Sequence, residues 1–150
     1  MRILLQRVTH ASVEVEGEVV AAIHNGIVAL VGFKKGDSRA HLAEMASKLL
    51  HLRIFSDDRE RLHFSLLDSK GELLLVPQFT LYGDTSKGRR PDFFNALEPQ
   101  LAKELFEEFV EECRKLNPSK LGTGVFQAHM KVSLLNDGPV TLMLESPAAL

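Results

Sequence analysis

The chain has 150 residues, of which 45% are hydrophobic and 25% are charged, and its formal net charge is −2. This composition allows one compact domain with a sizeable core and excludes general disorder. The slightly negative charge argues against a protein that coats nucleic acid by bulk charge, although a local basic patch could still dock RNA.

The chain opens with a short apolar run, residues 3–8, which predicts a strand and is too short for a signal peptide. No stretch reaches the ~18 apolar residues of a membrane span. Cys113 is the only cysteine, which rules out an internal disulfide and fits a reducing compartment. We therefore expect a cytoplasmic protein that does not enter a membrane.

Strand signals dominate the first third of the chain. Valines at 13, 15 and 19 alternate with glutamates around a hairpin turn at Glu16-Gly17. His24-Asn25-Gly26 predicts a second turn, because Asn and Gly tolerate positive φ. The apolar run 27–31 then predicts a strand buried on both faces.

Two helices are expected. One follows an N-cap in Gly36-Asp37-Ser38 and ends near 51–53, with apolar residues at helical spacing from Leu42 to Leu52. The other starts at Pro99 and ends before Asn117-Pro118, with an apolar stripe that includes Cys113. The stripe predicts a buried thiol and not a nucleophile.

The remaining segments suggest strands and one long loop. Runs 64–67 and 73–76 flank a second predicted hairpin turn at 68–71, and 83–94 is predicted to be a functional loop. Alternation over 125–135 predicts a strand, Asn136-Asp137-Gly138-Pro139 a turn, and the residues from Val140 a last strand. We expect one α+β domain over 1–150, with a mostly antiparallel, barrel-like sheet and two main helices.

Conventional catalytic machinery is missing from the sequence. The six histidines form no metal-binding spacing with each other or with Cys113, and there is no Walker loop, G-x-S-x-G or G-x-G-x-x-G. We expect neither a metal nor a cofactor.

Two segments carry the functional argument, and each also has a simpler interpretation. Val76-Pro77-Gln78-Phe79-Thr80-Leu81 follows a buried strand but contains a proline, so it either leaves backbone N–H groups free for a ligand or continues a strand with Phe79 and Leu81 in the core. Asn136-Asp137-Gly138-Pro139 is good turn chemistry, and its Gly-Pro bond could be cis or trans.

Together with MRILLQRV, PQFTLYGDTSKGRRPDF and TGVFQAHMKVSLLNDGPVTLMLES, these segments resemble the D-aminoacyl-tRNA deacylase family across nearly the whole chain. The family's first motif is Ser-Gln-Phe-Thr-Leu, and its second, Asn-x-Gly-Pro-x-Thr, is fully matched. Pro77 replaces the motif serine, and Gln127 stands where a glycine is usual. A Pro-Gln start is also similar to animal-type deacylases that act on L-alanyl-tRNA.

The resemblance implies a homodimer with active sites at the subunit interface. Gly138 and Pro139 of one subunit, joined by a cis bond, would enter the pocket formed by Gln78, Phe79 and Thr80 of the other and exclude L-amino acids. Arg7 and Asn136 would support that gate.

The resemblance also suggests how the ester is cleaved. No His, Lys or carboxylate within the first motif could activate Thr80, so we expect assistance by the 2′-OH of the terminal adenosine and backbone donors near Phe79 and Thr80. Since glycine has no side chain to exclude, glycyl-tRNA is an expected second substrate.

Contacts to the tRNA itself are expected from three basic residues and from Met130 or Phe79. Lys87, Arg89 and Arg90 are candidates for binding acceptor-stem phosphates, and Met130 or Phe79 for packing on the terminal adenine. The competing hypotheses are an L-alanyl-tRNA editing deacylase and a non-catalytic RNA-end binding module.

Overall fold

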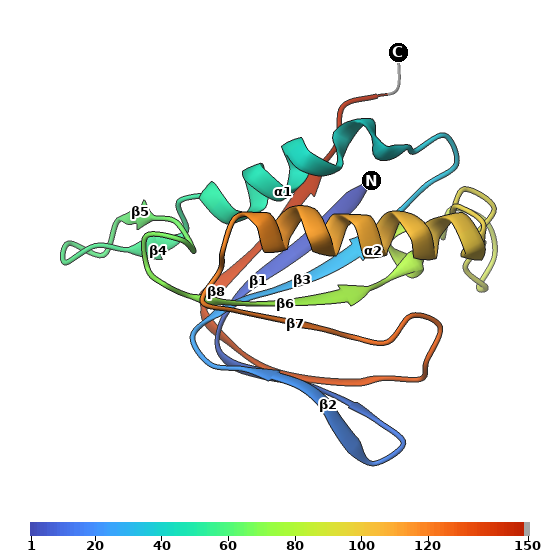
Figure 1. The fold of residues 1–150 in the computed structure, drawn as a ribbon. Coiled ribbons are helices and arrows are strands. Elements are labelled where there is room, and N and C mark those ends of the chain that lie inside the picture. The colour runs from blue at the N-terminus through green and yellow to red at the C-terminus, as the bar shows by residue number, and fades with distance from the viewer. Residues whose placement is uncertain (149–150) are drawn as a thin grey trace.

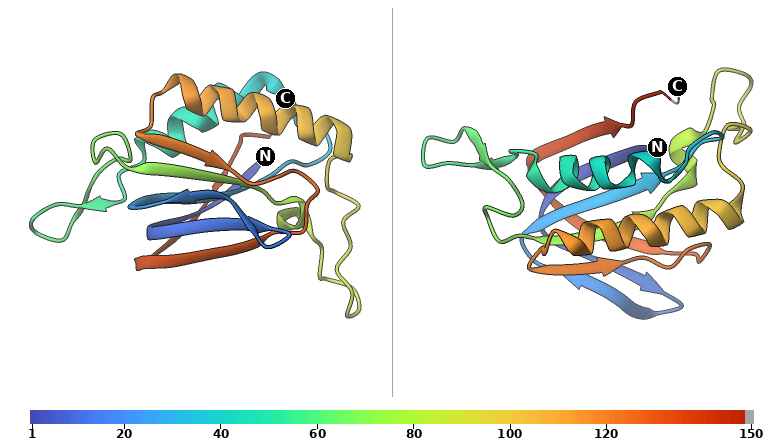
Figure 2. Two further views of the ribbon diagram at one scale, coloured as in Figure 1. Left: turned by 60° about the horizontal axis from the view of Figure 1, so that its bottom comes forward. Right: turned by 45° about the horizontal axis from the view of Figure 1, so that its top comes forward.

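The structure is a computed structural model that describes residues 1–148. Within these residues a curved sheet carries two helices on one face (Figures 1 and 2). In chain order the elements are β1 (Arg2–Val15), β2 (Glu18–Ile23), β3 (Gly26–Gly32), the 3-10 helix η1 (Arg39–His41), α1 (Leu42–His51), β4 (Phe55–Ser56), β5 (Leu62–Phe64), β6 (Glu72–Pro77), the 3-10 helix η2 (Phe79–Tyr82), α2 (Pro99–Lys115), β7 (Lys120–Thr123) and β8 (Lys131–Glu145).

The main sheet has the strand order β2-β1-β3-β6-β7, and β8 pairs with β1. β1 is antiparallel to β2, β3 and β8, so the predicted antiparallel character is confirmed for most of the pairings. A Cβ added to Gly122 of β7 would lie 3.2 Å from the Cβ of Ala21 in β2. The two ends of the strand order therefore approach each other, and the sheet is barrel-like.

The predicted hairpin around residues 68–71 is wrong. β6 is parallel to both β3 and β7, and the short β5 pairs with β4 instead. The reason lies in the connections between the strands. The chain passes through α1 between β3 and β6, and through α2 between β6 and β7. A connection that crosses over through a helix brings the next strand back in the same direction. Both helices consequently cover the same face of the sheet (Figure 2).

The C-terminal strand also differs from its prediction. β8 begins at Lys131 and not near 125, because residues 124–130 form a loop in which Gln127 has φ 63°. The chain then does not reverse at Asn136-Asp137-Gly138-Pro139. Asn136 pairs with Val8 and Thr141 pairs with Gln6, so residues 137–140 form a bulge opposite one residue of β1. The hairpin-turn interpretation is therefore wrong.

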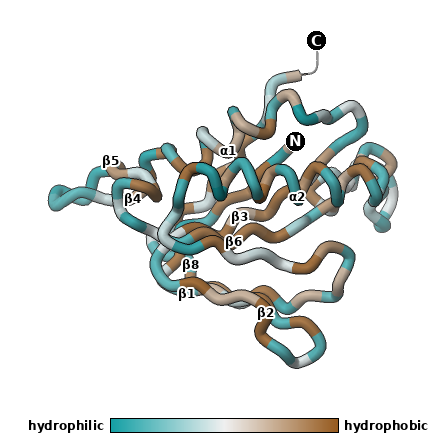
Figure 3. Tube along the Cα trace, in the orientation of Figure 1, coloured by the Kyte–Doolittle hydropathy of each residue, from teal (hydrophilic) through white to brown (hydrophobic). Residues whose placement is uncertain are grey.

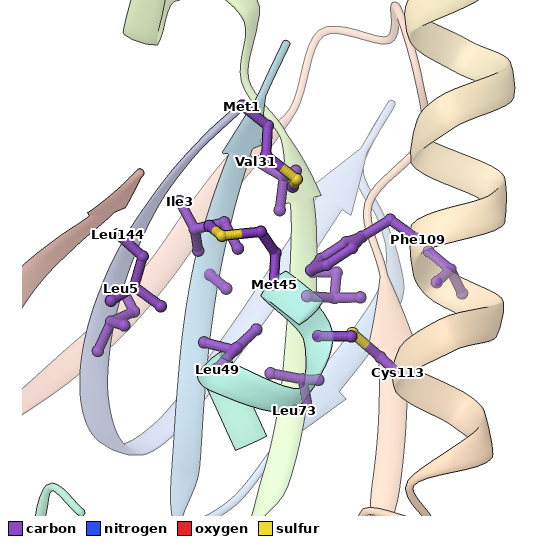
Figure 4. Packing of buried hydrophobic residues seen from close by; sticks show 14 of the residues in the cluster. Met1, Ile3, Leu5, Val31, Met45, Leu49, Leu73, Phe109, Cys113 and Leu144 are labelled. Atoms are coloured by element: carbon purple, nitrogen blue, oxygen red, sulfur yellow. The ribbon is translucent and has the colours of Figure 1, made fainter. Parts of the chain in front are cut away.

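The two predicted helices are confirmed at nearly the predicted bounds. Ser38 caps the first helical turn by accepting from the N–H of Ala40, and Pro99 starts α2 with the Glu98 carboxylate accepting from the N–H of Leu101. Their apolar faces pack on the sheet, with Met45 and Leu49 from α1 beside Phe109 and Cys113 from α2 (Figure 4). Burial raises the pKa of the Cys113 thiol to about 12, so the thiol stays protonated.

β3 and β6 are apolar apart from Glu72 at the start of β6, and side chains on both faces of these strands are buried (Figure 3). Ile27, Leu73 and Leu75 face the helices, whereas Val28 and Leu74 belong to a second cluster on the opposite face. These two central strands form a rigid support, and the first functional segment leaves the sheet directly from the end of one of them. No helix within residues 1–148 is long and apolar enough to cross a membrane.

Candidate active site

The first segment lies at the carboxyl end of β6. Pro77 is the last residue of the strand and pairs with Val31 of β3, and the Gln78 N–H donates to the Val31 carbonyl at 2.7 Å. The chain then turns into η2, where the side chain of Phe79 is 56% exposed. The interpretation of Phe79 as a core residue of a continued strand is therefore wrong, and the proline marks the end of the strand.

The start of η2 leaves backbone donors unpaired. Among residues 1–148, the N–H groups of Phe79 and Thr80 have no hydrogen-bond partner, whereas those of Leu81 and Gly83 bond back to Gln78 and Thr80. The two free N–H groups are neighbours in one turn of 3-10 helix. This arrangement can bind an anionic oxygen.

The Thr80 hydroxyl has one partner within the described residues, the side-chain amide of Gln78, which donates to it. No imidazole, amine or carboxylate contacts this hydroxyl there. The hydroxyl therefore lacks the base that an activated nucleophile requires.

A cavity of about 270 Å³ opens beside Phe79, between the end of β6 and the start of α2. Phe79 is one of its lining residues and packs edge-to-face on Phe93 at 5.0 Å between ring centroids. Pro77 and Gln127, the two departures from the family pattern, both line this cavity. Met130 is not among its lining residues; its Sδ accepts from the Val125 N–H at 3.3 Å and holds the 124–130 loop.

The second segment is the bulge at residues 137–140 in β8. Its Gly138-Pro139 bond is cis, and Gly138 has φ 142°. The Arg7 guanidinium, 12% exposed, donates from Nε to the Asp137 carbonyl at 2.8 Å and from Nη1 to the Ile54 carbonyl at 2.7 Å. Arg7 thus connects the bulge to the segment that enters β4.

Asn136 closes the bulge from within. Its Oδ1 accepts from the Val140 N–H at 2.8 Å, and its Nδ2 donates to the Thr141 hydroxyl at 2.9 Å. Gln6 donates to the same hydroxyl at 3.2 Å. Sequence reasoning did not assign a role to Thr141 or Gln6. The threonine belongs to the Asn-x-Gly-Pro-x-Thr pattern, so a signal for it was present, whereas the Ile54 carbonyl has no signature in the sequence.

One chain does not bring the two segments together. Arg7, which holds the bulge, pairs with Ile27 at the start of β3, whereas Pro77 pairs with Val31 near its end. These positions are four residues apart in β3, a distance of roughly 13 Å along the strand. Gly138 and Pro139 are absent from the lining of the cavity beside Phe79.

The predicted loop is confirmed between η2 and α2. Asp84 and Asp92 bond to each other through their backbones at 2.7 and 2.8 Å and close its base. Lys87, Arg89 and Arg90 lie exposed at its tip, and none of them forms an ion pair within residues 1–148. The three cations are therefore free to meet a polyanion.

Solved structures define the class of fold. The chain superposes on a structure named "c-Myc DNA Unwinding Element Binding Protein" with a TM-score of 0.92 and 42% identity, covering 99% of this chain and 100% of the other. A second structure, described as a probable eukaryotic D-amino acid tRNA deacylase, gives a TM-score of 0.84 with 95% and 97% coverage, and at 18% identity it shows the fold alone.

Sequence comparison gives the family. The family model described as D-Tyr-tRNA(Tyr) deacylase matches residues 4–145, and the chain belongs to this family. Relatives named D-aminoacyl-tRNA deacylase include one from Thermosipho africanus, 52% identical over 146 residues and 97% of both chains, and one from Myxococcus xanthus, 52% identical over 147 residues and 98% and 95% of the two chains. The family and the enzyme class expected from the two motifs are confirmed.

Proposed function

We propose that this protein hydrolyses the ester bond of D-aminoacyl-tRNA and releases the free D-amino acid and the tRNA. The observation that carries the proposal is the family match over residues 4–145, which includes both functional segments. The relatives named D-aminoacyl-tRNA deacylase support it. The competent substrate is a charged tRNA, so the proposal includes a cytoplasmic location.

The reaction proceeds without a protein nucleophile. Water attacks the ester carbonyl with assistance from the 2′-OH of the terminal adenosine, and the bond to the 3′ oxygen breaks. The free N–H groups of Phe79 and Thr80 are available to the developing oxyanion, and such donors are typically worth ~3 kcal/mol each. The Thr80 hydroxyl, which accepts from the Gln78 amide, orders the turn that presents them.

The site is completed by a second copy of the chain, whose Gly138 and Pro139 enter the pocket beside Gln78, Phe79 and Thr80. Two observations support a dimer. The two segments of one chain lie at different ends of β3, and β8 carries exposed apolar side chains, among them Leu135, Leu142 and Met143.

Selection against L-amino acids follows from steric exclusion by this gate, and Arg7 and Asn136 hold the gate in position. Exclusion acts on a side chain, so glycyl-tRNA passes the gate as well. In this proposal the exposed cations Lys87, Arg89 and Arg90 bind acceptor-stem phosphates, and Phe79, which is exposed beside the cavity, packs on the terminal adenine.

One assay separates the proposal from its two competitors. The purified protein is incubated with D-tyrosyl-, L-alanyl- and glycyl-tRNA, and ester hydrolysis is followed. We expect turnover of the D-tyrosyl and glycyl substrates. Turnover of the L-alanyl ester without the D-form would identify an L-alanyl-tRNA editing enzyme. This alternative is tested because Pro77 and Gln127, the two departures from the family pattern, line the same cavity. Turnover of none would identify a non-catalytic nucleic-acid-end binder.

A further inference from the structure

A second concave surface lies beside Tyr82, at the other end of η2 from Phe79. It has a volume of about 400 Å³, and we refer to it as the basic pocket. Its lining includes three cations and one carboxylate, which are Arg2, Lys34, Lys35 and Glu145. Tyr82, the last residue of η2, also lines it. In a chain with a net charge of −2, this local excess of positive charge needs an explanation.

The carboxylate in the basic pocket does not neutralise the lysines. Glu145 is paired with the Nε of Arg2 at 2.5 Å, and this pairing holds its pKa below the usual range. Arg2 also donates from Nη1 to the Leu81 carbonyl at 2.9 Å, and this hydrogen bond holds its side chain against η2. Within residues 1–148 neither Lys34 nor Lys35 forms an ion pair, and both ammonium groups remain available to an anion.

The two lysines are held in place by the long loop. Lys34 bridges to Ala96, and the Lys35 N–H donates to the Asn95 carbonyl at 3.0 Å. The Lys35 ammonium lies 3.4 Å from the centroid of the Phe94 ring, a cation–π contact. Phe94 itself is 73% exposed. A phenyl ring with a cation against one face and solvent over the rest is a suitable platform for a nucleic-acid base.

The basic pocket is close to the candidate active site. Phe79 begins η2 and borders the cavity for the aminoacylated end, whereas Tyr82 ends η2 and lines the basic pocket. Three residues of 3-10 helix span about 6 Å. In the loop, Phe93 packs on Phe79 while the next residue, Phe94, is stacked by Lys35. Nucleotides that precede a terminal adenosine bound at Phe79 would reach this surface.

We infer that the basic pocket binds the single-stranded 3′ end of the tRNA just before its terminal adenosine, with Lys34 and Lys35 on backbone phosphates and Phe94 stacked on a base. Combined cationic and aromatic contacts are the usual means of holding unpaired RNA. This inference rests on the proposed function, because it locates the RNA portion of that substrate.

The test compares two substrates that differ in their phosphates. D-tyrosyl-tRNA carries the complete 3′ end, and 3′-O-D-tyrosyl-adenosine carries the ester and the adenosine alone. For Lys34→Ala/Lys35→Ala we expect kcat/KM on the tRNA to fall about tenfold at low salt, with the salt slope reduced by roughly 1.4, while hydrolysis of the adenosine ester stays within about twofold. Phe94→Ala should show the same selective loss without the change in slope.

Matched controls are present in the chain. Lys48→Ala/Lys115→Ala removes the same charge from exposed positions at the ends of the two helices far from the loop, and Phe64→Ala removes an exposed phenylalanine from β5. Both should behave as wild type on the two substrates. Wild-type efficiency of the lysine variant on tRNA, or an equal loss on both substrates, overturns the inference.

Failure of the proposed function is distinguishable. If the wild type hydrolyses neither ester, that function is wrong, and the inference is then decided by the affinity for a fluorescent single-stranded RNA ending in CCA. Weaker binding by the lysine variant than by its control supports the basic pocket, and equal affinity refutes it.

Discussion

Arg7 donates from Nε to the carbonyl oxygen of Asp137 at 2.8 Å and so fixes the bulge of β8 to β1, its neighbour in the sheet. The same guanidinium bonds to the Ile54 carbonyl with Nη1, so one planar group holds two backbone segments. A lysine could satisfy one of these carbonyls but has no rigid fork with which to bridge both.

Arg7→Ala should therefore loosen the bulge and with it the proposed gate. We expect kcat on D-tyrosyl-tRNA to fall by about tenfold or more, because a displacement of about 1 Å at a positioned group is costly. Hydrolysis of L-tyrosyl-tRNA should rise relative to the D-form, and Arg7→Lys should be intermediate. The measurement is the ratio of the two rates, with Arg61→Ala on the β4–β5 hairpin as the control. A lower melting temperature with an unchanged ratio would mean that Arg7 has a structural role only.

Gly138→Ala tests the space inside the bulge. An added Cβ would lie 2.9 Å from the Arg7 Nη2 and 2.9 Å from a methyl of Val140, at a φ of 142°. Gly17→Ala is the control, because its φ is also positive, at 80°, but nothing lies within 4 Å of the added atom. We expect each variant to lose roughly 1–2 kcal/mol of folding free energy, and Gly138→Ala alone to lose most of its hydrolytic activity. Equal activity of the two variants would argue against a role for the bulge in the reaction.

Thr80→Ala separates the two chemical routes. With no base beside the hydroxyl, we expect kcat/KM on D-tyrosyl-tRNA to remain within about tenfold of wild type. A substrate whose terminal ribose lacks the 2′-OH should instead be hydrolysed far more slowly by both proteins. A loss of roughly a thousandfold on Thr80→Ala, with the 2′-deoxy substrate unaffected, would establish threonine as the nucleophile.

The turn before β6 should show pH-dependent stability. The buried Ser65 donates to the Asp68 carboxylate from its N–H at 2.9 Å and from its hydroxyl at 2.8 Å, and these bonds lower the pKa of Asp68. A carboxylate with a lowered folded pKa stabilises the protein above its unfolded value of about 3.9, and this stabilisation is lost as the pH falls through the folded pKa.

We expect Asp68→Ala to melt at a lower temperature than wild type at pH 7. The difference between the two melting temperatures should begin to shrink below about pH 4, where the Asp68 carboxyl of the unfolded chain becomes protonated, and should shrink further as the pH falls through the lower folded pKa. The two melting temperatures are measured by circular dichroism at pH values from about 3 to about 7, in steps of about one pH unit. A difference that stays constant over this range would exclude the charged hydrogen bonds as its cause.

Local periodicity was sufficient to predict the two helices, the double-sided burial of β3 and the loop that carries Lys87, Arg89 and Arg90, because each depends on residues near one another in sequence. The direction of β6 was not predictable in this way, since its partner β3 lies across the α1 crossover. Asn136-Asp137-Gly138-Pro139 has the composition of a reversing turn, but pairing with β1 on both sides keeps the chain in one direction.

In the candidate site, too, features set by neighbouring residues were predictable, whereas features set by residues distant in sequence were not. The proline at the end of β6 indicated where a strand would release its backbone, and Phe79 and Thr80 just after it are exposed as that interpretation requires. No sequence motif marked the basic pocket, which contains Lys34, Lys35 and Arg2. These residues come together only when the long loop folds back on the segment after β3 and when β8 pairs with β1.

The pairing of β1 with β8 also has a consequence for the order of folding. Arg2 and Glu145, which join the two strands, are 143 residues apart in the chain. Closing so long a segment costs entropy before any contact repays it, which slows the formation of such pairs. During synthesis β1 can pair early with β2 and β3, but its other edge waits for β8 to emerge. The Arg7 contact with the bulge therefore cannot form until β8 has been made, so the proposed chirality gate would assemble after the β1–β2–β3 part of the sheet.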